Sequence, residues 1–244
     1  MAINNGYDEK QIISAIAIAL DEFYTSLISK VNELDIDKVM KRKNPYLFRA
    51  KAMSGAAQIV DAILAAFVSS SEETVFGNVF FEPIACAAAQ GNKALAEGVD
   101  IMVERDGAIY AIAVKSGTSV FNADSRKKQE QNFMAASKLA QQAKKRFVPI
   151  IGYGYGKKKA SNRGMPKFYQ ELAGKAFWAE LTGDENFYIK LIKMMDKIPE
   201  KYVEEFDAAY QRAANRLVKE FTNKFCLEDG SIDWEKLVIF NSGD

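Results

Sequence analysis

The stretch from residue 96 to residue 117, AEGVDIMVERDGAIYAIAVKSG, constrains the fold of this chain more than any other. It contains an apolar alternation that ends at Val103, a turn sequence Arg105-Asp106-Gly107, and a second alternation from Ile109 to Ala113. Two alternating runs joined by a short Asp-Gly turn are typical of a β-hairpin. The sequence therefore predicts two adjacent antiparallel strands in this stretch.

The predicted hairpin brings two charged residues together, Asp100 on the first strand and Lys115 near the end of the second. Adjacent antiparallel strands lie about 5 Å apart, so both side chains can face one site. A carboxylate can hold a divalent cation that polarises a phosphate and activates water, while a lysine stabilises developing negative charge. The pair suits metal-assisted phosphodiester hydrolysis, although two solvated charges at the strand ends would leave the same pattern.

Composition narrows the class of protein. The chain has 244 residues, 48% of them hydrophobic and 27% charged, which is enough for one large domain with a full core. It has no histidine, which excludes Ser-His-Asp triads, HNH-type nucleases and histidine-ligated zinc. Cys86 and Cys226 lack the spacing of a zinc site or disulfide framework, so we expect a cytoplasmic location. The sequence lacks a basic-then-apolar leader and a long apolar run, so we expect neither export nor a membrane span.

Two basic segments are candidate nucleic-acid contacts, although the net charge of the chain is only +1. Residues 38–51 interleave cations with aromatic residues, as a surface that follows phosphates requires. Residues 157–167 follow a Gly-rich run without P-loop spacing, and their cations can contact phosphates or guanine edges. Each segment could equally be a solvated loop. The candidate contacts are Lys41, Arg42, Lys43, Arg49, Lys51, Lys157, Lys158, Lys159, Arg163 and Lys167.

Two glutamates are candidates for an acidic ligand beside Asp100. Glu82 is the single acid in the apolar segment 74–90, where a buried carboxylate needs a partner or a metal. Glu130 is an isolated acid on a predicted basic helix that follows the hairpin. Glu82 could instead point outward or cap a turn, and Glu130 could be an ordinary surface ion-pair former.

Helical periodicity predicts helices on both sides of the hairpin. Apolar spacing predicts helices over residues 8–34 and 54–69. The serines and glutamates of residues 69–73 are typical of a helix N-terminus, so we expect a new element to begin there. Residues 146–156 predict a third core strand.

Residues 168–225 are expected to be helical throughout, with an apolar stripe from Val203 to Phe221 that serves either core packing or a dimer face. The sequence shows no linker, repeat or low-complexity segment. We therefore expect a single domain over residues 1–244. Its expected parts are an N-terminal helical part (1–70), a catalytic core (71–156) and a C-terminal helical part (157–244).

Several blocks of the sequence, in their joint order and spacing, resemble type II restriction endonucleases of the PmeII-like group, within the PD-(D/E)xK nuclease superfamily. The blocks span almost the whole chain. The loop TSVFNADS after Gly117 departs from the family, which carries a Trp- and Asn-containing turn there. The matching blocks are KRKNPYLFRAK (41–51), SSSEETVFGNVFFE (69–82), EGVDIMVERDG (97–107), AVKSG (113–117), the segment from Phe177 to Gly183, and DGSIDWEKLVIFNS (229–242).

The superfamily motif has an Asp before a hairpin that ends in (D/E)-x-Lys, and this chain reads Asp100 and then Ala113-Val114-Lys115. The family carries a small residue where Ala113 stands. It also carries an acid after the aromatic residue at Phe81, which favours Glu82 as the second ligand. In several nucleases with an interrupted motif, an acid one helix downstream binds the metal, which makes Glu130 the second choice.

The resemblance implies an α/β fold with a small mixed central sheet flanked by N- and C-terminal helices. It implies Mg²⁺-dependent, sequence-specific cleavage of double-stranded DNA by a homodimer. Asp100 and Glu82 would hold Mg²⁺ with the main-chain carbonyl of Val114, while Lys115 orients or helps deprotonate the attacking water. The alternative is a catalytically inactive DNA-binding protein of the same fold, for which Ala113 is the best indication. A nuclease that reads branched DNA or RNA structure is a third possibility.

Overall fold

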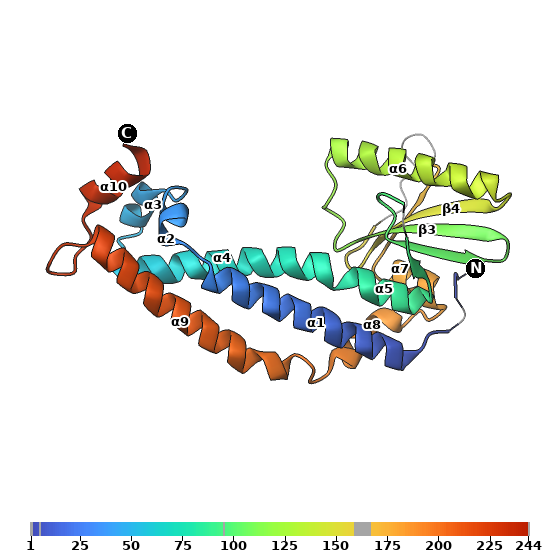
Figure 1. Cartoon of the computed structure of the whole chain (residues 1–244), viewed down its shortest axis with the longest axis horizontal. Helices are drawn as coiled ribbons and strands as arrows, with labels where there is room; N and C mark the ends of the chain where they lie inside the picture. The colour runs from blue at the N-terminus through green and yellow to red at the C-terminus, as the bar shows by residue number, and fades with distance from the viewer. Residues whose placement is uncertain (1, 5, 95, 159–166, 244) are drawn as a thin grey trace. The chain divides into compact units, whose positions relative to one another are not determined.

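The computed structural model describes residues 2–4, 6–94, 96–158 and 167–243 (Figure 1). The chain divides into two compact units, each built from two separate segments. We call residues 1–22 with 76–199 the sheet unit, and residues 23–75 with 200–244 the helical unit. The boundaries predicted near residues 70 and 156 do not coincide with this division. The expectation of a single domain stays a prediction.

The sheet unit contains a mixed five-stranded sheet whose strands lie in chain order from β1 to β5. The strands β1, β2 and β3 are antiparallel neighbours, whereas β4 runs parallel to both β3 and β5. The second halves of β3 and β4 are buried, as expected of parallel strands covered on both faces. The predicted helix-rich α/β fold with a small mixed sheet is confirmed. The strands are β1 (Asn92–Lys93), β2 (Ile101–Arg105), β3 (Ala108–Lys115), β4 (Arg146–Tyr153) and β5 (Gln170–Ala173).

The predicted hairpin is present as β2 and β3. Its last pair is Arg105 with Ala108, which leaves Asp106 and Gly107 as a two-residue turn. Both turn residues have positive φ angles, 50° and 69°. Such a turn matches the right-handed twist of the flanking strands, and Asp-Gly is a preferred sequence for it. The prediction of a third core strand is also confirmed, by β4.

Helices cover both faces of the sheet (Figure 1). The helix α6 (Ala123–Gln142) packs on β3 and β4, while α5 (Phe81–Ala89) and α7 (Lys175–Thr182) lie on the other side. Asn122 caps α6 reciprocally with Ser125, which fixes where the helix begins. A further helix, α8 (Phe187–Met195), packs against α7. The sheet is therefore covered by helices on both faces, and residues at the ends of its strands remain available for a functional site.

The predicted boundary at residues 69–73 is wrong, because α4 runs without interruption from Ala56 to Val79. The Thr74 hydroxyl donates to the Ser70 carbonyl, 2.9 Å away, within the helix itself. Polar side chains that bond to their own helix need not end it. The boundary lies instead at Phe80, where Pro83 lacks the amide hydrogen that would continue the helix.

The prediction that residues 168–225 are entirely helical is also wrong, because β5 lies within them. This strand has only four residues and pairs in parallel with β4. Its sequence has no alternation that marks a strand, and its pairing partner decides its conformation. Gly174 follows it with a φ of 50°, which favours glycine and turns the chain into α7.

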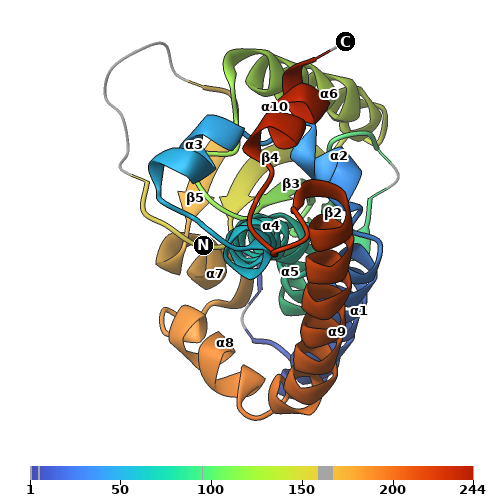
Figure 2. The same cartoon turned by 90° about the vertical axis from the view of Figure 1, so that its left-hand side faces the viewer.

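The helical unit forms its own core from apolar faces of α4 and α9 with short helices around them (Figure 2). The basic segment 38–51 is part of two short helices, joined at Asn44, whose side chain accepts from the Leu47 amide. Most of the stripe on α9 is buried in this core, for example Ala213, Leu217 and Phe221. The stripe therefore serves packing within the unit. The short helices are α2 (Ile36–Met40), α3 (Pro45–Ala50) and α10 (Trp234–Ser242), and α9 spans Glu200–Phe225.

The first helix, α1 (Glu9–Asn32), confirms the helix predicted over residues 8–34. By length and composition alone it is apolar enough to cross a membrane. Core helices of water-soluble proteins meet the same criterion, and the side chains of Ile12, Ile16 and Leu20 are buried in this structure. That no membrane is involved stays a prediction.

Candidate active site

Asp100 and Lys115 meet at one end of the hairpin, as predicted. Asp100 directly precedes β2, and its amide donates to the Ile112 carbonyl at 2.9 Å, which holds it against β3. One oxygen of its carboxylate, Oδ2, accepts from the Val114 amide at 2.6 Å and lies 3.4 Å from Lys115 Nζ. Lys115 Nζ also donates to the Val114 carbonyl at 2.9 Å. Two oxygens, from Asp100 and Val114, thus converge on a single cation.

Glu82 lines the same hollow as Asp100. It lies in the first turn of α5, and its Oε1 is 3.2 Å from Lys93 Nζ on β1. The hollow has a volume of about 770 Å³, and we call it the acidic hollow because Glu22, Glu82 and Asp100 all line it. Both Glu82 and Asp100 are partly exposed, so their free oxygens remain open to a ligand from solvent.

Gln11 and Glu22 of α1 also line the acidic hollow, a contribution that was not predicted from the sequence. These residues lie on the polar face of a helix predicted only to pack, and nothing local links them to Asp100. Within the residues that the structure describes, no three His, Cys, Asp or Glu side chains cluster closely enough to hold a metal. Of the predicted ligands, the carboxylates of Glu82 and Asp100 line the hollow, whereas the Val114 carbonyl, which accepts from Lys115 Nζ, is not among its lining groups.

Cys86 also lines the acidic hollow but does not extend its donor set. Its Sγ donates to the Gly91 carbonyl at 3.4 Å. Burial, and secondly the charge of Glu82, raise the pKa of the Cys86 thiol. The thiol therefore stays protonated at neutral pH, and the thiolate needed for metal binding or nucleophilic attack is disfavoured.

Ala113 occupies the position of the second motif acid, and its side chain is fully buried (0% exposed). It belongs to an apolar cluster between the sheet and α6, which includes Ala111, Phe133 and Tyr153. A carboxylate there would lose water without gaining a cation, at a cost of several kcal/mol. The small residue is therefore part of the packing, and any second acid must come from elsewhere.

Glu130 does not join Asp100. It lies on α6 and accepts a hydrogen bond from the Tyr169 hydroxyl at 2.9 Å. It is not among the residues that line the acidic hollow. The structure thus brings Glu82, and not Glu130, to the same hollow as Asp100.

A second carboxylate, Glu171 on β5, is surrounded by cations. Its Oε1 accepts from Lys158 Nζ at 2.5 Å, from the guanidinium of Arg126 at 2.8 Å and from the Tyr153 hydroxyl at 2.8 Å. Its Oε2 accepts from Lys167 Nζ at 2.6 Å, and its side chain is only 10% exposed. Lys158 and Lys167, both predicted to contact DNA, are exposed residues that are held in an ion cluster around the nearly buried Glu171.

The pKa shifts around Glu171 agree with this arrangement. Burial acts to raise the pKa of Glu171, but hydrogen bonds from Lys158, Lys167, Arg126 and Tyr153 outweigh it and hold the pKa well below its usual range. Burial, together with the bond to Glu171, raises the pKa of Tyr153 to about 12. The carboxylate is thus ionised and fully occupied, which is typical of a structural ion cluster.

The other predicted DNA contacts are described only in part. Lys41, Arg42, Arg49 and Lys51 are exposed on the helical unit. Arg49 lies 5.3 Å from the centre of the Trp234 ring, and Lys41 lies 5.9 Å from that of Phe240. These cations rest on aromatic faces and keep their charge toward solvent. Lys43 is half-buried and Lys157 is exposed, whereas Lys159 and Arg163 lie outside the described residues.

Comparison with known proteins identifies the family of the chain. A family model of the type II restriction endonuclease EcoO109I matches residues 10–202. No curated protein matches the chain. The matched family is not the PmeII-like group that the sequence resembles, so the match confirms the broader resemblance to type II restriction endonucleases. The match includes the hairpin, both candidate glutamates and most of the helices, and the chain therefore belongs to the EcoO109I family of type II restriction endonucleases.

Proposed function

We propose that this protein is a Mg²⁺-dependent endonuclease that cuts double-stranded DNA at a specific sequence. The observation that carries the proposal is the convergence of Asp100, Val114 and Lys115, with Glu82 lining the same hollow as Asp100. Family membership makes DNA the substrate, and this site is where a phosphodiester would meet a carboxylate and a lysine together.

The donor set fits Mg²⁺. Asp100, Glu82 and the Val114 carbonyl would hold the ion, because all three supply oxygen and Mg²⁺ takes one or two carboxylates with waters. Bound there, the ion would supply Lewis-acid polarisation of the phosphate and a more acidic water. Lys115 Nζ lies beside the same oxygens, 2.9 Å from the Val114 carbonyl, where its charge can stabilise a phosphorane-like transition state. It can also orient the attacking water.

Substrate contact is proposed for the exposed cations. Lys41, Arg42, Arg49 and Lys51 would bind phosphates, because they are exposed and each neutralised phosphate releases counterions. Lys157 would do the same in the sheet unit. A two-fold homodimer is the simplest assembly that reads a palindromic site, and we propose a homodimer on that ground. We also propose a cytoplasmic location. Kinship to the PmeII-like group likewise stays a prediction.

The competing function is a catalytically inactive DNA-binding protein of the same fold. The observation that favours it is Ala113, which is buried among apolar side chains where the motif would have an acid. In that case DNA binding would be equal with and without metal, and Asp100 and Lys115 would be an ordinary ion pair.

Cleavage separates the two functions. The purified protein is incubated with phage and plasmid DNA in Mg²⁺ or in EDTA, and the ends of any fragments are sequenced. The proposal predicts discrete fragments that share one end sequence and appear only with Mg²⁺. Intact DNA in both conditions, with DNA binding retained in a gel-shift assay, would establish the inactive protein instead. Cleavage at branched or otherwise unusual DNA structures, with no shared sequence at the fragment ends, would favour a structure-selective nuclease.

A further inference from the structure

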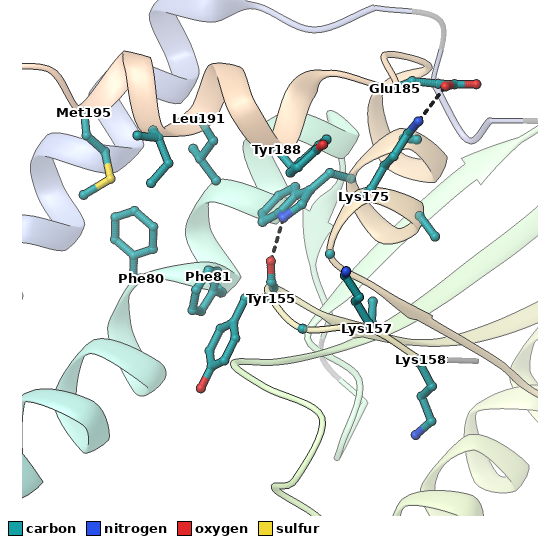
Figure 3. Close-up of a pocket in the computed structure, with 18 of the residues that line it drawn as sticks. Phe80, Phe81, Tyr155, Lys157, Lys158, Lys175, Glu185, Tyr188, Leu191 and Met195 are labelled. Atoms are coloured by element: carbon teal, nitrogen blue, oxygen red, sulfur yellow. Dashed lines mark hydrogen bonds and ion pairs between the residues drawn. The ribbon is translucent and has the colours of Figure 1, made fainter. Parts of the chain in front are cut away.

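The sheet unit holds a second hollow, larger than the acidic one and of different chemistry (Figure 3). Its volume is about 950 Å³, near the upper end of the range of about 300 to 1,000 Å³ for small-molecule sites. Six aromatic side chains line it, from the end of α4, the start of α5, the loop after β4, and helices α7 and α8. We call it the aromatic pocket; the six are Phe76, Phe80, Phe81, Tyr155, Trp178 and Tyr188.

The inner wall of the aromatic pocket is fixed by packing. The indole Nε1 of Trp178 donates to the Gly154 carbonyl at 2.8 Å. Phe81 packs directly on Gly154, since a Cβ at that glycine would lie only 2.2 Å from the ring. The rings of Phe81 and Tyr155 are 5.9 Å apart between centres. Residues that are held in place lose little freedom when a flat ligand enters.

The mouth of the aromatic pocket is exposed and apolar. Tyr155 is 53% exposed and Tyr188 is 40% exposed, and Ile192 beside them on α8 is 69% exposed. Exposed aromatic faces next to a hollow are costly to leave in water and are typical of a ligand site. A planar, apolar group is the shape that such rings accept, because rings stack face to face with an offset.

The lysines at the aromatic pocket favour an anionic ligand. Lys157, Lys158 and Lys175 line it, against a single acid, Glu185, which pairs with Lys175 at 2.8 Å. Lys158 is engaged by Glu171, whereas Lys157 forms no ion pair within the described part of the chain. The pocket therefore combines aromatic faces with excess positive charge. A nucleotide meets both requirements, with a base to stack and a phosphate to pair.

The aromatic pocket adjoins the candidate active site through the backbone. The Gly154 amide donates to the Lys115 carbonyl at 2.8 Å, and the Tyr155 amide donates to the Ser116 carbonyl at 3.0 Å. Phe81 and Glu82 are consecutive residues, and the first lines the aromatic pocket while the second lines the acidic hollow. A DNA strand cut at Asp100 would thus have a neighbouring nucleotide within reach of the pocket.

We propose that the aromatic pocket binds one unstacked nucleotide of the DNA substrate. The base lies among Phe81, Tyr155 and Tyr188, and its phosphate is held by Lys157. This inference rests on the proposed function, because DNA must be the substrate for the nucleotide to belong to it. Enzymes that take a nucleotide out of the stack read it in such aromatic pockets.

Trp178 provides a direct readout. The chain has two tryptophans, so a Trp234→Phe variant leaves Trp178 as the single indole, in the wall of the pocket. Thymidine 5′-monophosphate and thymidine are titrated against this full-length variant while Trp178 fluorescence is followed. We expect a saturable fluorescence change, with tighter binding of the monophosphate than of the nucleoside.

Variants locate the bound probe. Tyr188→Ala should weaken binding of the monophosphate about tenfold, the typical loss when one stacking ring is removed. Ile189→Ala is the matched control, since Ile189 is exposed on the same helix and does not line the pocket. Lys157→Gln should remove the preference for the monophosphate over the nucleoside. Its control is Lys193→Gln, an exposed lysine outside the pocket.

The outcomes separate this proposal from the proposed function. A protein that cuts DNA but shows no saturable change with millimolar monophosphate would overturn the pocket and leave the nuclease intact. Equal losses in Tyr188→Ala and Ile189→Ala, or equal binding of nucleoside and monophosphate, would also overturn it. Binding that follows the pocket variants in a protein that does not cut DNA would support the pocket as a nucleotide site and refute the nuclease. Folding of each variant is checked by thermal unfolding.

Discussion

Two carboxylates of the sheet unit, Asp100 just before β2 and Glu171 on β5, both contact lysine, yet their surroundings differ. Asp100 has one lysine and one amide as partners, and it lines a hollow open to solvent. Glu171 has two lysines, an arginine and a tyrosine as partners, and it is almost buried. A carboxylate with free oxygens can bind a ligand, whereas one that is fully occupied can only stabilise the fold. The number of hydrogen-bond and ion-pair partners of the carboxylate therefore distinguishes the candidate active site from the structural ion cluster.

The largest expected effect tests the open site. Lys115→Ala should lower the cleavage rate by about 10² to 10³-fold, because a charge aimed at the transition state is removed. Cleavage is measured at saturating Mg²⁺ on DNA that carries the identified target. Lys128→Ala, which alters an exposed ion pair with Glu97, is the control and should cleave normally. Normal cleavage by Lys115→Ala would place the reaction elsewhere.

The next effect concerns Ala113, which stands where the superfamily motif has its second acid. Ala113→Glu restores the acid of the superfamily pattern but buries it among apolar side chains, so it should lower the free energy of unfolding by about 3 kcal/mol or more. Urea denaturation of the variant and the parent measures this. A variant as stable as the parent, with faster cleavage, would show that the position is open to the metal and that the packing argument fails.

Glu171→Gln tests whether the Glu171 ion cluster stabilises the fold. It should lower the free energy of unfolding at pH 7 by about 2 kcal/mol, since three cations lose their shared counter-charge. The pKa of Glu171 is lowered in the folded state, so its contribution is present above the ordinary glutamate pKa of about 4.3. That contribution is lost as the pH falls through the lowered value.

Denaturation at several pH values checks the sign of this effect. The stability difference between parent and Glu171→Gln should be largest at neutral pH and shrink steadily below about pH 4. Glu185→Gln, which alters an exposed pair with Lys175, is the control and should change stability little at any pH. A difference that grows in acid would contradict the assigned direction of the pKa shift.

The smallest expected effect decides between the two candidate second acids. Glu82→Gln should raise the Mg²⁺ concentration needed for half-maximal cleavage by about tenfold or more, because a charged ligand becomes neutral. Glu130→Gln should leave it unchanged, since Glu130 bonds to Tyr169 outside the acidic hollow. The reverse result would exchange their roles.

Sequence patterns predicted the elements whose conformation is set by neighbouring residues in the chain. The hairpin, β4 and α1 follow from alternation, an Asp-Gly turn and helical spacing, and Asp100 meets Lys115 because the hairpin register places them together. The short strand β5 was missed because pairing with β4 stabilises it and its own sequence does not. The serine run was misread because N-cap residues can also bond within a helix.

The rest of the site depends on contacts between distant segments. Glu22 reaches the acidic hollow from a helix far from the hairpin in sequence, and no spacing rule relates them. The Glu171 cluster draws Arg126 from α6, Tyr153 from β4 and Lys158 from the segment after β4, so its members look like separate side chains in the sequence. Lys158 and Lys167 were predicted to bind DNA for this reason.

A side-by-side measurement of Asp100→Asn and Glu171→Gln tests whether the solvent-open carboxylate serves DNA cleavage and the enclosed one serves stability. Each variant is assayed for Mg²⁺-dependent DNA cleavage and for its thermal unfolding midpoint against the parent. The account predicts that Asp100→Asn unfolds near the parental midpoint but does not cut DNA, whereas Glu171→Gln unfolds at a clearly lower temperature and still cuts DNA while folded. Undiminished cleavage by Asp100→Asn, together with loss of cleavage by folded Glu171→Gln, would contradict it.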